Sequence, residues 1–333
     1  MAISVYRPAW FVPGAHLQTL WGKLVRRRIP LFARMEQWET PDGDFVEIHR
    51  AEPPRERNAP RLLMLHGLEG TPRSHYVGGV FAEARRRGWG ADLLVFRGCG
   101  AELNRARRFY HSGETTDLDF VVRRIVGEYP GRPLLLCGVS LGGNVLLKWL
   151  GEQGDEAPAE VRGAAAVSVP YDLARGCRHI QEGFSRVYDR HFVRSLVRKV
   201  RRKRSAHPDL PSDDVLAGVR TLWDFDDAVT APVHGFRDAK DYYARSSSLG
   251  FLAGIRVPTL LLSAADDPFL PREVLAQVET VARANPAFTV EFTEHGGHVG
   301  FVSGRVPWKP VYYAERRVAE FLAERLTGSS SNV

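Results

Sequence analysis

The chain has 333 residues, of which 44% are hydrophobic and 26% charged, and its formal net charge is +7. This is the composition of a globular protein with ample material for a core, which excludes a largely disordered chain. Three cysteines, an odd number at wide spacings, predict neither a disulfide framework nor a zinc site, and they suit a reducing compartment.

The N-terminal sequence MAISVYRPAWFVPG lacks a charged start followed by an apolar stretch, so no signal peptide is expected. The longest apolar runs have the length of a strand, and none approaches the ~18 residues that indicate a membrane-spanning helix. We therefore expect a soluble, cytoplasmic protein.

Taken in chain order, the predicted elements alternate between strands and helices. Residues 35–51 predict a β-hairpin, because two alternating segments flank the turn sequence PDGD. Short apolar runs predict buried strands at 61–67, 91–98, 132–140, 163–170, 258–264 and 287–295. Apolar residues at helical spacing predict helices at 76–87, 114–128, 141–151 and 311–326. Non-alternating strands separated by helices predict an α/β fold with a mostly parallel, doubly wound sheet that is covered on both faces.

The segment from about 171 to 256, called the insertion below, interrupts this alternation. It is basic, rich in aromatic residues and largely helical, and it lies between two predicted sheet strands. We expect a single domain over residues 1–328, with the insertion packed as a lid over the carboxyl edge of the sheet. Residues 329–333 are expected to form a disordered tail.

The insertion contains the basic run RSLVRKVRRKR at 194–204. A solvated helix face is the favoured interpretation, and weak contact with an anionic membrane is the alternative. No nucleic-acid-binding signature accompanies the run, so no nucleic-acid partner is expected. Eight aromatic residues predict either the wall of an apolar acyl pocket or the insertion's own small core: Phe184, Tyr188, Phe192, Trp223, Phe225, Phe236, Tyr242 and Tyr243.

A serine stands inside a glycine cluster at the hinge between a predicted strand and a predicted helix. The sequence from Gly138 to Gly142 has the form G-x-S-x-G, with Ser140 at its centre. Such a turn forces the serine into a strained conformation and projects its hydroxyl into the crevice at the carboxyl ends of the strands. A tight structural turn is the alternative, and a Walker phosphate loop is excluded because Gly-Lys-Ser/Thr is absent.

A serine hydroxyl needs a base, and the base needs an orienting carboxylate. The hydrolase order is Ser, then Asp or Glu, then His. Asp266 and Asp267 follow a buried strand, and we favour Asp267 as the acid, with Asp266 orienting the loop. His295 and His298 follow the next strand, and we favour His298 as the base because glycines flank it.

Two backbone N–H groups are expected to form an oxyanion hole. One is that of Leu141, directly after the serine, and the other is that of Leu68, in the loop after the strand at 61–67. His66 and Gly67 are expected to set the geometry of that loop.

Two further segments have predicted positions but no predicted chemistry. Residues 97–104 follow a strand end and should line the crevice. The stretch GAHLQTLW, with His16 and Gln18, should pack near the mouth of the site.

The sequence resembles the YheT-like branch of the α/β-hydrolases over nearly its whole length. The stretches that carry the resemblance are HLQTLW, LLMLHGLEG, VFRGCGAELNRARRFYHSGETTDL, LCGVSLGGNVLLKWLGE, FDDAVTAPVHGFRDAKDYY, VPTLLLSAADDPFLP and GGHVGF. The resemblance implies an α/β-hydrolase fold, with Ser140, Asp267 and His298 as the charge-relay residues. The family includes esterases, phospholipases and enzymes that act on medium-chain acyl esters.

These observations predict a serine esterase that acts on short- to medium-chain acyl esters or acylglycerols through an acyl-enzyme. Activity should rise as His298 loses its proton. No metal or organic cofactor is expected. The alternatives are an acyltransferase that passes the acyl group to an alcohol, and a thioesterase or amidase. A non-catalytic ligand-binding protein is the least favoured.

Overall fold

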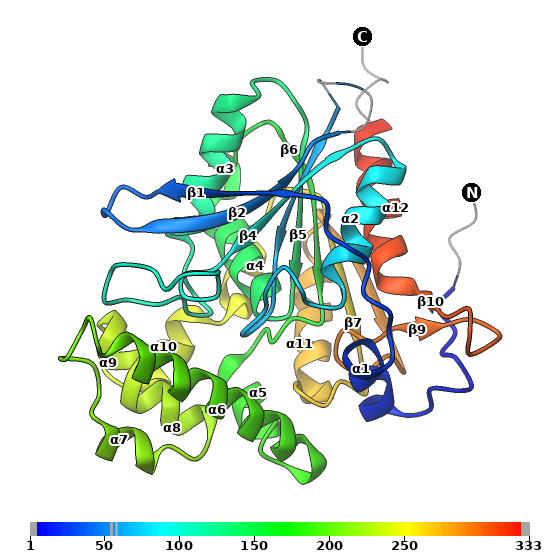
Figure 1. Ribbon diagram of the computed structural model, residues 1–333. Helices are drawn as coiled ribbons and strands as arrows, with labels where there is room; N and C mark the ends of the chain where they lie inside the picture. The colour runs from blue at the N-terminus through cyan, green and yellow to red at the C-terminus, as the bar shows by residue number, and fades with distance from the viewer. Residues whose placement is uncertain (1–4, 54–55, 57–58, 328–333) are drawn as a thin grey trace.

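The computed structural model describes residues 5–53, 56 and 59–327. Its centre is a sheet of eight strands in the spatial order β1-β2-β4-β3-β5-β6-β7-β8 (Figure 1). The strands are β1 Arg34–Glu39, β2 Phe45–Ala51, β3 Arg61–Leu65, β4 Gly90–Val95, β5 Leu134–Val139, β6 Val161–Val167, β7 Thr259–Ala264 and β8 Phe288–Thr293. β2 is antiparallel to both β1 and β4, and the other neighbouring pairs are parallel. The predicted doubly wound, mostly parallel sheet is confirmed.

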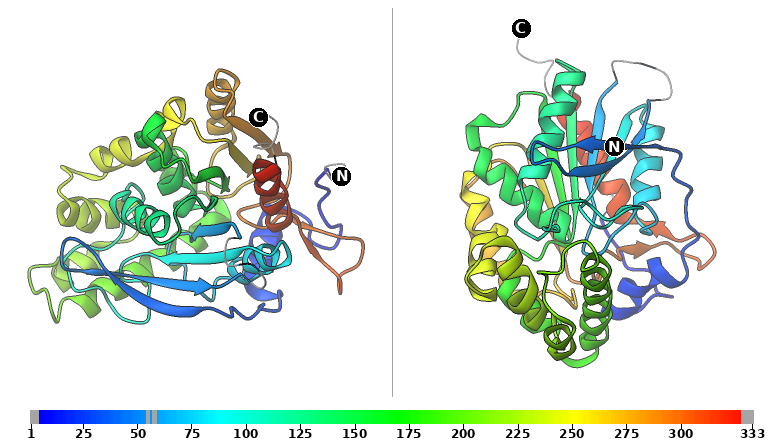
Figure 2. Two further views of the ribbon diagram at one scale, coloured as in Figure 1. Left: turned by 90° about the horizontal axis from the view of Figure 1, so that it is seen from above. Right: turned by 60° about the vertical axis from the view of Figure 1, so that its left-hand side comes forward.

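The burial of the strands explains why their apolar residues do not alternate. Every residue of β3, β4, β5 and β7 is buried, since helices cover both faces of the sheet. The helices α3 and α4 lie on one face, and α2 and α12 lie on the other (Figure 1, Figure 2). The bounds of the covering helices are α2 Val77–Arg86, α3 Thr116–Glu128, α4 Leu141–Gln153, α11 Arg272–Arg283 and α12 Tyr313–Thr327.

The sheet order reverses at β3, which lies between β4 and β5. At such a reversal the loops that follow two neighbouring strands turn in opposite directions, and a crevice opens between them at the carboxyl ends of the strands. The loops after β3 and β5 carry Leu68 and Ser140, so the sheet topology alone brings these two segments together.

The stretch between β6 and β7 is helical and lies beyond the carboxyl ends of the strands (Figure 1). Its helices are α5 Leu173–His179, α6 Arg186–Lys203, α7 Asp213–Gly218, α8 Leu222–Phe225, α9 Ala231–His234 and α10 Ala239–Ser246, and a π-helical turn covers Asp226–Thr230. Two small apolar clusters hold these helices together, one around Phe225 and Val200 and the other around Tyr242 and Tyr243.

The sequence patterns did not predict α11 between β7 and β8, nor the elements near the N-terminus and directly after β8. Helix α1, Ala15–Leu24, packs beside the loop that contains His298, and a two-stranded sheet pairs β9, Val302–Ser303, with β10, Val311–Tyr312. Within the described part of the chain, no helix combines the length and apolar character needed to cross a bilayer. The predicted tail at 329–333 lies outside the described residues.

Candidate active site

Ser140 sits between β5 and α4 in a strained turn. Its φ of 54° and ψ of −123° are unusual for a residue with a side chain. A Cβ on Gly138 would lie 2.5 Å from the carbonyl oxygen of Gly142, and one on Gly142 would lie 2.5 Å from that of His66. Only glycine fits these two positions, because the strand, the turn and the helix are in direct backbone contact.

The three side chains predicted to act together form one chain of hydrogen bonds. Nε2 of His298 lies 2.8 Å from Oγ of Ser140. Nδ1 of the same ring lies 2.8 Å from Oδ2 and 3.1 Å from Oδ1 of Asp267. Asp267 and His298 are both buried, with 4% and 8% of their surface exposed. This geometry favours the tautomer with Nδ1–H on the carboxylate, in which the unprotonated Nε2 faces the serine hydroxyl.

The neighbouring carboxyl group has a different position. Asp266 accepts a hydrogen bond of 2.8 Å from the backbone N–H of Gly297, and Nδ1 of the exposed His295 lies 3.3 Å away. Asp266 and His295 therefore face each other at the outer side of the loop, whereas Asp267 and His298 face Ser140.

Residues that the sequence analysis did not single out fix the histidine loop. Phe269 stacks on the ring of His298 at 4.0 Å between centroids. Thr19 of α1 accepts a hydrogen bond of 2.9 Å from the N–H of His298, and Ser168 accepts one of 3.0 Å from the N–H of Val299. Ser168 directly follows β6, so its position at a strand end was a usable signal, whereas nothing in the sequence around Thr19 marked it.

The stretch GAHLQTLW, which was predicted to pack near the mouth of the site, forms most of helix α1. The side-chain amide of Gln18 donates to the carbonyl oxygens of Val12 and Val302 and accepts from the N–H of Val302. Gln18 therefore supports the chain just after the histidine loop, while His16 lies 3.2 Å from the hydroxyl of Tyr188 in the insertion.

Leu68 and Leu141 both line the same cavity as Ser140 and His298. Leu141 is the first residue of α4, where a backbone N–H has no acceptor within the helix. The loop around Leu68 is fixed by His66, whose Nδ1 lies 2.7 Å from the carbonyl oxygen of Gly67 and whose Nε2 accepts from the N–H of Phe96. Burial lowers the pKa of His66 to about 4, so the ring stays neutral in this role.

The residue after Leu68 links this loop to the insertion. Glu69 has a positive φ of 55°, and its carboxylate accepts from Tyr110, at 3.0 Å, and from two residues of α6. Those two residues are Ser195, at 2.6 Å, and Lys199, which forms an ion pair with it. Burial opposes the charge on Glu69, but the Lys199 ammonium and the hydrogen bonds that the carboxylate accepts together outweigh it and hold the pKa of this carboxyl below its usual value.

A cavity of about 130 Å³ opens at Ser140, between the sheet edge and the insertion. Of the eight aromatic residues considered above, four line it: Phe192, Phe225, Tyr242 and Tyr243. Phe225, Tyr242 and Tyr243 also belong to the insertion's small apolar clusters, against which Trp223 and Phe236 pack. The two interpretations therefore hold together for Phe225, Tyr242 and Tyr243, which belong both to a cluster and to the cavity wall. Phe184 and Tyr188 belong to neither.

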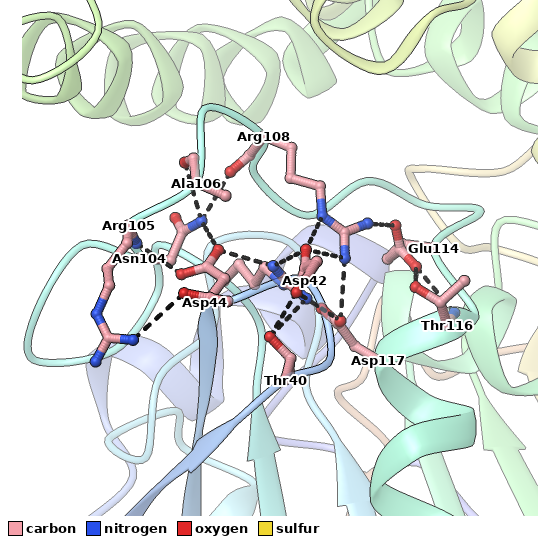
Figure 3. Close-up of polar contacts among 12 residues, drawn as sticks. Thr40, Asp42, Asp44, Asn104, Arg105, Ala106, Arg108, Glu114, Thr116 and Asp117 are labelled. Carbon is pink, nitrogen blue, oxygen red and sulfur yellow. Dashed lines mark hydrogen bonds and ion pairs between the residues drawn. The ribbon is translucent and has the colours of Figure 1, made fainter.

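The expectation that residues 97–104 line the crevice is wrong. Of the described residues, those in this stretch are absent from the cavity wall. Arg97 is buried and pairs with Asp44, Asp42 and Asp117. Asn104 donates to Asp44 at 2.6 Å (Figure 3). The loop turns away from the crevice because this network ties it to the β1–β2 turn and to α3.

The basic run at 194–204 lies on α6 and just past its end, and it is not uniformly solvated. Lys199 and Lys203 are buried, and the Lys203 ammonium donates to the side chain of Asn104 at 2.6 Å. Arg201 and Arg204 both pair with Asp213. Contact of this helix with an anionic membrane stays a prediction.

A protein family described as serine aminopeptidase, S33, matches residues 61–301 of the chain. The YheT protein of Escherichia coli (strain K12), which is named as a candidate esterase, is 38% identical over 330 residues, or 97% of this chain and 95% of that protein. Phospholipase ABHD3 of Mus musculus is 28% identical, over 96% of this chain and 78% of its own length.

Solved structures agree in fold. The esterase Pf2001 of Pyrococcus furiosus superimposes with a TM-score of 0.57 at 16% identity, covering 88% of this chain and 93% of its own. At that identity the likeness concerns the arrangement of the sheet and its helices.

Proposed function

We propose that this chain, which belongs to the YheT-like branch of the α/β-hydrolase family, is a serine hydrolase. Its proposed reaction is the cleavage of carboxylic esters through an acyl-enzyme intermediate. The hydrogen-bonded series from Asp267 through His298 to Ser140 carries the proposal. The relatives named as an esterase and a phospholipase support ester bonds as the target.

In this mechanism Oγ of Ser140 attacks the ester carbonyl carbon while Nε2 of His298 takes the hydroxyl proton. The protonated ring then passes that proton to the departing alcohol, and the acyl group stays on the serine. Asp267 keeps Nδ1 protonated and stabilises the charged ring. A water molecule, activated by the same nitrogen, releases the acid and restores the serine.

The N–H groups of Leu141 and Leu68 are the proposed donors to the carbonyl oxygen when it becomes an oxyanion. The strained turn supports this assignment, since it sets Ser140 at the helix start, where unpaired N–H groups and the positive end of the helix dipole lie. His66 and Glu69 fix the second donor from either side, so little reorganisation is needed during the reaction.

The size of the cavity favours small acyl groups. An engineered cavity of about 150 Å³ in another protein holds one benzene molecule. A space of about 130 Å³ thus suits a group of about six heavy atoms. Within the short- to medium-chain range, turnover should be highest near butanoate to hexanoate and should fall for longer chains.

A fluorophosphonate probe and a series of p-nitrophenyl esters test the nucleophile. The wild-type protein should form one adduct by intact mass, and Ser140→Ala should lose the adduct and about 10⁴-fold or more of its turnover. Ser112→Ala is the matched control, because Ser112 lines the same cavity outside the hydrogen-bonded series. An adduct that survives in folded Ser140→Ala would refute the assignment.

The description of the matching family as a serine aminopeptidase gives one alternative substrate class, a peptide bond after a free amino terminus. Aminoacyl p-nitroanilides assayed beside the esters compare the two. Faster turnover of the anilides, with the same dependence on Ser140, would keep the nucleophile and replace the ester.

A further inference from the structure

The wall of the cavity beside Ser140 is mostly apolar, but one part of it is polar. Asp226, Thr230 and Tyr243 all line the cavity. The hydroxyl of Thr230 donates to Oδ1 of Asp226 at 2.6 Å, and the hydroxyl of Tyr243 donates to Oδ2 at 2.7 Å. Two hydroxyls from different parts of the insertion thus hold one carboxyl group in a fixed orientation at the cavity.

The backbone at this point is also unusual. Asp226–Thr230 forms a π-helical turn between α8 and α9. Such turns are rare and are frequently found at functional sites. The turn begins at Asp226 and ends at Thr230, and these two residues are joined by a side-chain hydrogen bond. The irregular backbone therefore lies at the polar part of the cavity wall.

Asp226 has unused hydrogen-bonding capacity. Each carboxylate oxygen has about two acceptor sites, and each is engaged by a single hydroxyl. Among the residues that the structure describes, Asp226 has no cationic partner within ion-pair distance. Burial raises the pKa of Asp226 to about 6, because the charged form of the carboxyl group is disfavoured beside apolar walls. A charged group in that setting is costly unless something further binds to it.

We infer that Asp226 binds a hydroxyl group of the ester substrate, and thereby selects esters that carry a hydroxyl on the part held in the cavity. The inference rests on the proposed function, because it concerns the substrate that Ser140 attacks. A hydroxyl fits better than an ammonium group, since a full cation would lose far more hydration in an otherwise apolar cavity.

The hydroxyl can belong to the acyl chain or to the alcohol, and two pairs of esters distinguish these sources. Ethyl 6-hydroxyhexanoate against ethyl hexanoate tests the acyl chain. Glycerol 1-butanoate against propyl butanoate tests the alcohol. We expect wild-type kcat/KM to favour the hydroxylated member of one pair by about 10- to 100-fold, the range of a hydrogen bond to a charged acceptor.

The variant Asp226→Asn should reduce that preference to about twofold or less while the plain ester is still hydrolysed. Asp227→Asn is the matched control, because Asp227 is exposed, does not line the cavity and accepts the N–H of Ala239. It should keep the full preference. Tyr243→Phe removes one of the hydroxyls that orient Asp226 and should give an intermediate preference.

The outcomes separate the two proposals. Hydrolysis of the plain esters that depends on Ser140 tests the proposed function alone. No preference in either pair by the wild type, or an undiminished preference in Asp226→Asn, would overturn the role of Asp226. If Asp226→Asn fails to fold, Tyr243→Phe provides the test. A preference of Tyr243→Phe for the hydroxylated ester that equals the wild-type preference would also overturn the role of Asp226.

Discussion

Two adjacent carboxyl groups, Asp266 and Asp267, have separate tasks, and the difference arises from the direction in which each side chain leaves the same loop. Asp267 points inward to the ring of His298, and Asp266 points outward to the N–H of Gly297. Both residues therefore support the histidine loop, but of the two only Asp267 contacts the ring of His298, the proposed base.

Replacement of each acid by its amide separates these tasks. Asp267→Asn should lower kcat by about 10⁴-fold, because an amide cannot hold the required ring tautomer. Asp266→Asn keeps a carbonyl oxygen for the N–H of Gly297 and should cost less than about tenfold. Steady-state kinetics on a p-nitrophenyl ester measures both. Equal losses in the two variants would contradict the assignment of Asp267.

Gly138 and Gly142 allow the strand, the turn at Ser140 and helix α4 to approach one another closely. In Gly142→Ala the new methyl would overlap the carbonyl oxygens of His66 and Leu65, so strand and helix would have to separate. We expect loss of stability by more than about 2 kcal/mol and loss of activity. Gly127→Ala in α3 is the control, since its Cβ meets no atom within 4 Å. It should stabilise the helix by about 0.5–1 kcal/mol, as measured by urea unfolding.

Among the elements, the contact of α6 with the loop after β3 has the clearest consequence. Glu69 joins the two through Ser195 and Lys199, one position beyond the proposed oxyanion donor Leu68. A displacement of the insertion would therefore be transmitted to the site through this carboxylate as well as through the cavity wall.

Lys199→Met should lower kcat by about tenfold with little change in KM, because the donor loop loses its anchor while the cavity remains. The adduct rate with the fluorophosphonate probe should fall in parallel. Arg198→Met, one residue away and exposed, is the control and should resemble the wild type. A change confined to KM would instead indicate that Lys199 shapes only the binding of substrate.

At the scale of the whole molecule, several histidines are shielded from solvent by the fold. Burial lowers the pKa of His66 and His75 to about 4 and that of His111 and His234 to about 3. Between pH ~6.5 and these values the unfolded chain binds protons that the folded chain does not. Each such histidine therefore stabilises the fold at neutral pH, and that stability is lost as the pH falls.

His75→Gln isolates one of these contributions from the carboxyl groups that titrate in the same range. Between pH 6.5 and 4 the free energy of unfolding of the variant should fall less steeply than that of the wild type, by up to about 1.4 kcal/mol per pH unit. Urea unfolding at several pH values gives both slopes. Parallel curves would show that His75 binds its proton equally in both states.

Much of the fold could be predicted from local pattern. The runs around β3, β5 and β7 are apolar without alternation, and only a sheet covered on both faces buries such strands completely. Sequence patterns also predicted the G-x-S-x-G turn at Ser140 and the order of Ser140, Asp267 and His298. Their proposed chemistry depends on residue type and on position after a strand, and both can be read from the sequence.

Other features depend on contacts between distant segments. The path of residues 97–104 is set by the pairing of Arg97 with Asp44 and Asp117, and no local pattern encodes that network. Thr19 supports the histidine loop across 279 positions of sequence. Asp226 belongs to FDDAVTAPVHGFRDAKDYY, one of the stretches that carry the family resemblance. Its position in the cavity wall, however, follows only from the folded insertion.

The sequence by itself determined the class of sheet, the strained serine turn and the residues predicted to act with it, because periodicity and residue chemistry are local properties. Only the tertiary structure decided which loops reach the crevice, which of the basic residues of α6 are buried and which polar groups share the cavity with Ser140. Those outcomes depend on how buried polar and charged groups find partners across the fold, and such partners come from segments far apart in the sequence.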